Sequence, residues 1–125
     1  MLRRNILSIS VALVILYLSL ASSETFDKIP VFHFRGEDKV VHFVMYAVLM
    51  GTLLFENRKI INTGRRLVLI AMIPILFGAI LEVMQSWLTT SRFGSIYDLL
   101  FNIFGILFSL SIYLLVMNHR REKIK

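Results

Sequence analysis

Apolar residues in this chain gather into four long runs separated by short polar segments. The runs cover Ile6–Ala21, Val40–Phe55, Leu67–Leu88 and Ile96–Met117. Helices of soluble proteins average about 11–12 residues, whereas a bilayer crossing needs about 20 mostly apolar residues. The pattern therefore predicts an all-α membrane protein with four transmembrane helices. The first two runs are the shortest, and we expect flanking residues with polar ends to extend them to the interface.

The composition agrees with this fold class and excludes several others. Hydrophobic residues make up 57% of the 125 residues and charged residues 18%, whereas a soluble domain has about 45–50% and about 25%. So apolar a chain excludes a disordered protein, and we expect a single transmembrane domain over residues 1–125. The absence of cysteine excludes disulfides, thiolate metal sites and thiol nucleophiles.

Lysine and arginine are distributed unequally between the two sides of the predicted helices. Two precede the first run, four lie between the second and third runs, and four lie in the C-terminal tail. The opposite side has Lys28, Arg35, Lys39 and Arg92. Because basic residues concentrate in cytoplasmic loops, both termini are predicted to be cytoplasmic. Topology thus accounts for the net charge of +6, and we predict no nucleic-acid partner.

The first run also has the features of a secretory signal peptide. Arg3 and Arg4 precede an apolar segment, and Ser19-Leu20-Ala21 is an acceptable cleavage site. Cleavage after Ala21 would leave three spans and an external N-terminus, with the remaining topology unchanged. We predict the uncleaved form and keep cleavage as the alternative.

Polar residues inside the last three runs recur at helical spacing, and such residues are costly in lipid unless they face protein or water. The stripes are Asp38, His42 and Tyr46; Gly78, Glu82 and Gln85; and Asp98, Asn102 and Gly105. Residues at this spacing share one helix face, and the topology brings the three stripes to a similar depth below the outer surface. Arg92 lies in the short external loop nearby. The sequence therefore predicts an outward-facing polar pocket whose ligand-binding residues are the polar members of these stripes together with Arg92.

A histidine with carboxylates and amides is compatible with several kinds of chemistry. Such groups ligate metals, but their spacing here matches no metal motif, and we predict neither a metal nor another cofactor. His42 and Glu82 are the candidates for general acid–base catalysis at a lipid headgroup. No serine lies in a recognisable nucleophile motif, and there is no glycine-rich phosphate loop. Structural interpretations also exist, because Tyr46 suits an aromatic belt and Asp98 suits a helix N-terminus.

Three short motifs occur in order along the chain. They are Asp38-Lys39-x2-His42-Phe43-x2-Tyr46, then Glu82-x2-Gln85, then Arg92-x5-Asp98-x3-Asn102-x2-Gly105. Together they resemble the signature of VanZ-like membrane proteins over residues 38–109. Ser109 stands where the pattern has another small glycine, which concerns only the closeness of helix packing. The resemblance implies a multi-pass protein of the bacterial plasma (inner) membrane linked to the cell envelope, with teicoplanin resistance in the founding member. It implies no particular reaction.

We therefore expect the pocket to bind an amphipathic or lipid-linked envelope ligand, with the lipid bilayer as its surroundings and no protein partner indicated. Arg92 would attract an anionic headgroup. One alternative is a membrane-embedded hydrolase or transferase that uses His42 and Glu82. The other is a structural or assembly protein in which the polar residues only join helices. The residues favour the binding function over an enzyme.

Overall fold

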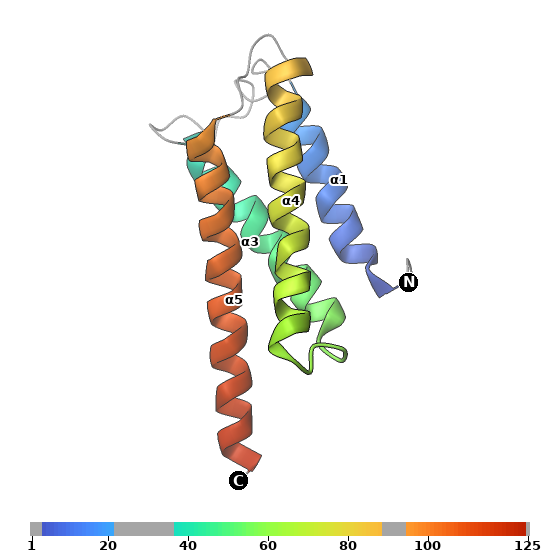
Figure 1. Cartoon of the computed structure of the whole chain (residues 1–125), viewed down its shortest axis with the longest axis vertical. Helices are drawn as coiled ribbons and strands as arrows, with labels where there is room; N and C mark the ends of the chain where they lie inside the picture. Colours follow the sequence, from blue (N-terminus) through green and yellow to red (C-terminus); the bar gives the residue numbers. More distant parts are fainter. Residues whose placement is uncertain (1–3, 22–36, 89–94, 125) are drawn as a thin grey trace.

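The computed structural model describes residues 4–21, 37–88 and 95–124, which form α1 (Ile6–Leu20), α3 (Glu37–Asn57), α4 (Gly64–Leu88) and α5 (Ile96–Ile124) (Figure 1). Three of them, α3, α4 and α5, are long and apolar enough to cross a membrane. The prediction of an all-helical chain is confirmed for the described residues, and three of the four predicted spans have the length and apolar composition of a transmembrane helix. α1 has 15 residues, which is roughly 23 Å and shorter than a full crossing.

Two helices extend further than the apolar runs that predicted them. α3 already begins at Glu37, so that Asp38 and Lys39 lie in its first turn. α5 continues past Met117 to Ile124 and ends with basic residues in its last turn. Cations interact favourably with the C-terminal end of the helix dipole. The basic residues of the last turn therefore stabilise the part of α5 that lies beyond the apolar run. A search for apolar residues alone underestimates both lengths.

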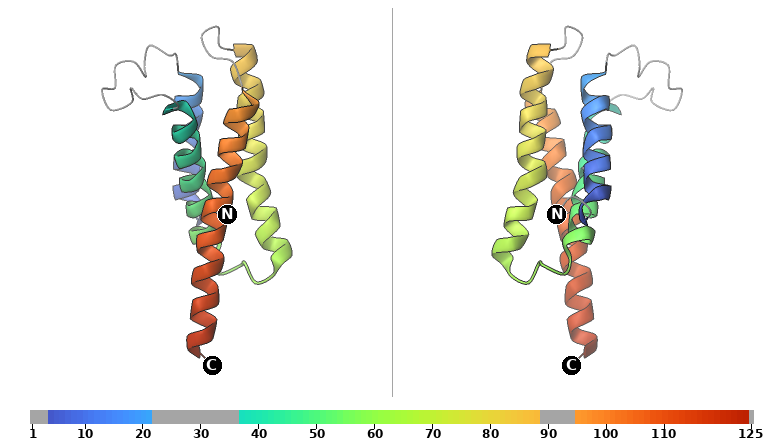
Figure 2. Two further views of the ribbon diagram at one scale, coloured as in Figure 1. Left: turned by 90° about the vertical axis from the view of Figure 1, so that its left-hand side faces the viewer. Right: turned by 90° about the vertical axis from the view of Figure 1, so that its right-hand side faces the viewer.

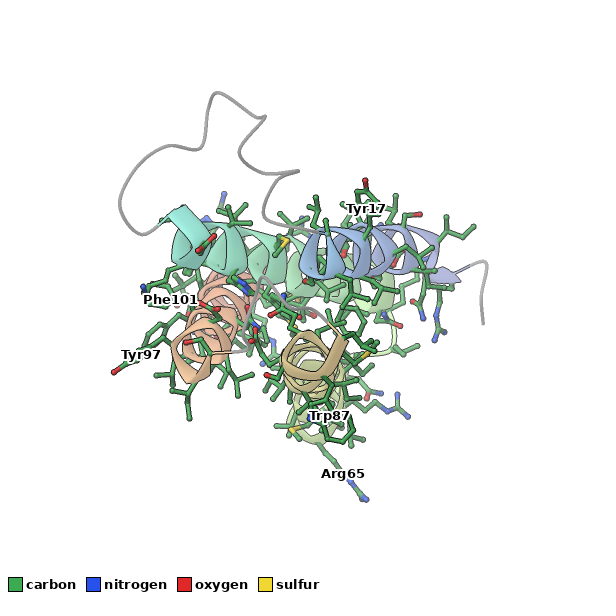
Figure 3. The ribbon with its side chains drawn as sticks, turned by 90° about the horizontal axis from the view of Figure 1, so that it is seen from above. Tyr17, Arg65, Trp87, Tyr97 and Phe101 are labelled. Carbon is green, nitrogen blue, oxygen red and sulfur yellow. The ribbon has the colours of Figure 1, made fainter. Side chains whose placement is uncertain are left out.

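The four described helices pack around one apolar core, and α3 contacts each of the other three. Seen from above, α1 and α3 form one side of the bundle and α4 and α5 the other (Figure 3). Every described helix contributes to the core, which consists of Ile15, Tyr46, Leu49, Met50, Leu53, Leu54, Ile70, Ala71, Leu81 and Ile106.

The outer surface of the bundle is apolar, as lipid contact requires. Leu69 and Ile80 of α4 are more than half exposed, and exposed apolar surface of this kind marks contact with a membrane or a partner. Tyr17, Trp87 and Tyr97 point away from the bundle, at the end where α1 and α4 finish and α5 begins (Figure 3). Because tyrosine and tryptophan concentrate at membrane–water interfaces, this end of the bundle is expected to lie at an interface.

α3 and α5 approach each other closely at Gly105. A Cβ atom there would overlap the carbonyl oxygen of Phe43 and lie 2.9 Å from the backbone nitrogen of Ala47. One turn further along α5, the Ser109 hydroxyl donates a hydrogen bond to the Ala47 carbonyl over 2.6 Å. Ser109 is therefore compatible with close packing, because its hydroxyl bonds to the facing backbone. This crossing fixes the relative position of the two helices.

Hydrogen bonds join both ends of α1 to other helices. The Glu56 carboxylate, at the end of α3, accepts the backbone N–H of Leu7 over 2.8 Å and that of Ser8 over 3.0 Å. It thereby satisfies amides that have no partner within a helix's first turn. At the other end, Gln85 Nε2 donates to the Ser19 carbonyl over 2.7 Å. Cleavage after Ala21 would remove all of these partners.

Candidate functional site

Three helices bring polar side chains to one level of the bundle. α3 and α5 begin, and α4 ends, at the same end of the molecule (Figure 2). His42 lies in the second turn of α3, Glu82 lies almost two turns before the end of α4, and Asn102 lies in the second turn of α5. All three side chains are buried. The sequence predicted this convergence from spacing and topology.

His42 is the centre of a group that we call the His42 cluster, formed by His42, Glu82, Asp98 and Asn102. His42 Nδ1 lies 2.9 Å from Asn102 Oδ1, within hydrogen-bond distance. The same nitrogen is 3.8 Å from Glu82 Oε1, and His42 Nε2 is 3.9 Å from Asp98 Oδ2. Because an amide oxygen only accepts, Nδ1 carries the proton in the bond to Asn102. A protonated ring would also direct an N–H toward Asp98.

A protonated imidazole would offset one of the two carboxylate charges of the His42 cluster and leave the other to a further partner. Two carboxylates flank one histidine, and isolated charges at this depth are costly unless they are paired or bound. Asp98 is the most exposed member, since 18% of its side chain is accessible. The cluster therefore presents Asp98 toward the surface and keeps His42, Glu82 and Asn102 inside the bundle.

Glu82 also has a structural role at the beginning of α5. Its Oε2 atom accepts the backbone N–H of Ser95 over 3.0 Å, and a carboxylate is stabilised near a helix N-terminus. The Ser95 hydroxyl in turn accepts the backbone N–H of Tyr97 over 3.2 Å. Sequence reasoning did not single out Ser95, because its contribution is a backbone N–H that any residue could supply.

The helices pack tightly one turn further into the bundle from His42. Tyr46 is 1% exposed, and its ring lies against α4 at Gly78. A Cβ on Gly78 would lie 3.0 Å from Tyr46 Cε1 and 3.1 Å from Asn102 Nδ2. Asn102 Nδ2 is itself buried and has no hydrogen-bond partner among the described residues. Gly78 thus makes room for the Tyr46 ring and for Asn102, the residue that bonds to His42.

The remaining predicted site residues lie outside the His42 cluster. Gln85 bonds to Ser19 of α1, so this amide joins helices. Asp38 is exposed in the first turn of α3. Arg92 lies outside the described residues. The structure therefore brings together His42, Glu82, Asp98 and Asn102, with Tyr46 packed beneath them.

Three members of the cluster are potential metal ligands. His42, Glu82 and Asp98 each offer a ligand atom, and these atoms lie within 4.8 Å of one another. However, Nδ1 is bonded to Asn102 and Nε2 faces Asp98, while Glu82 approaches from the Nδ1 side. Either ring nitrogen thus already has a polar neighbour, and the prediction that the site holds no metal is not tested by this geometry.

Each of the three sequence motifs contributes to the His42 cluster. His42 comes from the first, Glu82 from the second, and Asp98 and Asn102 from the third. The resemblance to VanZ-like proteins rests on these motifs. Comparison of the chain with protein-family models, with curated proteins and with solved structures gave no match.

Proposed function

We propose that the His42 cluster is an outward-facing intramembrane site that binds the headgroup of an amphipathic or lipid-linked cell-envelope ligand. The observation that supports this function is a buried imidazole held between two carboxylates and an amide from three helices. Small residues suffice to join helices in a membrane, so burial of these costly groups favours a functional role. The carboxylates would accept hydrogen bonds from hydroxyl or amino groups of the headgroup, and Arg92 would contact its phosphate.

The same proposal includes a VanZ-like protein of the bacterial plasma membrane with both termini in the cytoplasm. Its support is the order of the three motifs and the contribution of each to one cluster. A role in the cell envelope, such as resistance to teicoplanin, follows from that resemblance and is proposed with it.

Reporter fusions test the orientation of the site. Fusions at Asn62 and after Lys125 are expected to report a cytoplasmic location, and a fusion at Ser91 an external one. The reason is the basic residues Arg58, Lys59, Arg65 and Arg66 around the segment between α3 and α4. Reporter activities on intact cells measure this directly. An external signal at Asn62 would turn the His42 cluster toward the cytoplasm and contradict an envelope ligand bound from outside.

An enzyme is the second candidate, and one observation favours it. Asn102 orients the His42 ring through Nδ1 and leaves Nε2 facing Asp98, and a base oriented by another group is typical of nucleophilic catalysis. A hydrolase or transferase would use His42 and Glu82 as its acid and base. We favour binding because no nucleophile motif accompanies the histidine in the sequence.

Glu82→Gln is expected to fold normally and lose the bound ligand. The amide oxygen of glutamine can still accept the N–H of Ser95, but the negative charge beside His42 is gone. Hydrogen bonds to charged groups contribute about 1.5–3 kcal/mol, so retention of co-purifying lipid should fall by about tenfold or more. Mass spectrometry of lipids that remain on the protein after mild purification measures this loss.

Glu56→Gln is the matched control, because it makes the same chemical change near the end of α3, far from the His42 cluster at the beginning of that helix. It should retain the lipid bound by the wild type. If Glu82→Gln keeps the lipid but unfolds at lower temperature, the carboxylate serves to join helices and the structural alternative is correct. Unchanged lipid and unchanged stability would reject both roles for this charge.

A further inference from the structure

A groove lies between α3 and α5 in the half of the bundle that is opposite the His42 cluster. Its volume is about 460 Å³, within the range of about 300–1,000 Å³ typical of ligand pockets. Apolar residues such as Leu54, Ile112 and Val116 line most of it, and Arg58 and Arg120 complete the lining. The groove is thus apolar along its length and cationic where α3 ends.

The length of the groove matches one leaflet of a bilayer. Gly51 and Ser109 line its deep end. Arg58, the first residue after α3, lies about 10 Å beyond Gly51 in the direction of that helix, and Arg120 follows Ser109 by about 16 Å along α5. Half of a hydrocarbon core about 30 Å thick is about 15 Å. An acyl chain lying in the groove would therefore place its headgroup in the zone between the levels of Arg58 and Arg120.

The polar groups of the groove are suited to a phosphate and its ester oxygens. The Arg58 guanidinium lies 4.3 Å from the centroid of the Phe55 ring, a cation–π contact that orients it. Arg120 approaches from the other wall, and arginine suits phosphate recognition. Tyr113 also lines the groove, but its hydroxyl is buried, so the two arginines are the groups that a phosphate would meet.

Two other grooves have a similar volume but no basic residue in their described lining. One has a volume of about 440 Å³ and is lined by residues of one face of α4 between Leu76 and Leu88. The other, between α1, α3 and α4, has about 420 Å³. Neither has a lysine or arginine among its described lining residues. These two surfaces are expected to contact lipids without regard to headgroup charge.

We propose that the α3–α5 groove binds an anionic phospholipid, with one acyl chain along the groove and the phosphate between Arg58 and Arg120. Basic pockets between transmembrane helices bind anionic headgroups in this way. The site is separate from the His42 cluster and binds a different part of the membrane. With cytoplasmic termini it would face the cytoplasmic leaflet, which carries anionic lipid.

Native mass spectrometry of the full-length protein tests this site. The protein is given equal amounts of phosphatidylglycerol and phosphatidylcholine with identical acyl chains. The wild type is expected to retain phosphatidylglycerol preferentially. Replacing both groove arginines, in Arg58→Gln/Arg120→Gln, should lower that preference by about tenfold, because each basic residue near the headgroups adds to the attraction.

Arg65→Gln/Lys123→Gln is the matched control. It removes the same charge from the same half of the molecule, and neither residue lines the groove. Its lipid preference should stay within about twofold of the wild type. Equal losses in the two double variants would mean diffuse attraction, and no loss in either would mean no selection. Both outcomes overturn the proposed lipid site.

Gly51→Leu tests the apolar part of the same site. The added side chain would occupy the deep end of the groove, so retained phosphatidylglycerol should fall while both arginines remain. Unchanged retention would contradict an acyl chain lying between Gly51 and Ser109. None of these variants touches the His42 cluster, so failure here leaves the proposed envelope ligand to its own test at Glu82.

Discussion

Gly105→Ala is expected to force α3 and α5 apart and to cause a large loss of stability. The new Cβ would overlap the Phe43 carbonyl oxygen and crowd the Ala47 backbone nitrogen, and backbone atoms cannot rotate away as a side chain can. Overpacking of this kind costs about 1–3 kcal/mol, and we expect the upper end of that range. Thermal unfolding in detergent, followed by the helix signal, measures the effect.

Two other glycines provide graded controls for this substitution. Gly51→Ala would place its Cβ 3.9 Å from Ser109 Oγ, an ordinary contact, so stability should be unchanged or rise through the better helix propensity of alanine. Gly78→Ala should lie between the two, because its Cβ would meet side-chain atoms of Tyr46 and Asn102. If Gly105→Ala is as stable as Gly51→Ala, the two helices do not cross as closely as described.

A change in the α3–α5 crossing at Gly105 should also disrupt the His42 cluster. His42 and Asn102 lie on the two helices that meet there, and Asn102 is only one turn from Gly105. A displacement that lengthens their 2.9 Å contact leaves a buried imidazole without its partner. We therefore expect Gly105→Ala to lose co-purifying lipid as well as stability.

The helix pattern and the topology were sufficient to predict which polar residues meet. Residues four apart share a helix face, and helices that alternate in direction bring matching ends together. The first rule needs only the spacing within one helix, and the second needs only whether each helix runs up or down. Together they placed His42, Glu82, Asp98 and Asn102 at one level without knowledge of packing.

The partners of other residues depend on which helices are neighbours, and the sequence does not contain that information in any local pattern. Gln85 shares a face with Glu82, yet α1 lies beside it and its amide bonds to Ser19. Glu56 is separated from Leu7 by 49 residues and caps α1 only because α1 and α3 pack antiparallel. Both residues turn out to hold α1, a role that spacing along one helix cannot reveal.

His42→Gln is expected to separate the binding function from the enzyme. A general acid–base must exchange a proton in the transition state and contributes about 10²–10⁴-fold in rate, which glutamine cannot supply. A histidine that orients a ligand mainly needs a hydrogen bond, and the glutamine amide can still donate one to Asn102 Oδ1. For the binding function we expect weaker lipid retention by a modest factor and chemically identical lipid from both proteins.

Liquid chromatography with mass spectrometry of the recovered lipid decides between the two functions. His119→Gln makes the same change on the exposed end of α5 and should match the wild type in both the amount and the structure of its lipid. An enzyme gives a different result: lipid recovered from the wild type and from His119→Gln would be chemically altered, whereas lipid from His42→Gln would be retained unaltered. That outcome would assign proton transfer to His42 and reject a purely binding function, because a residue that only orients a ligand cannot change which covalent bonds the ligand contains.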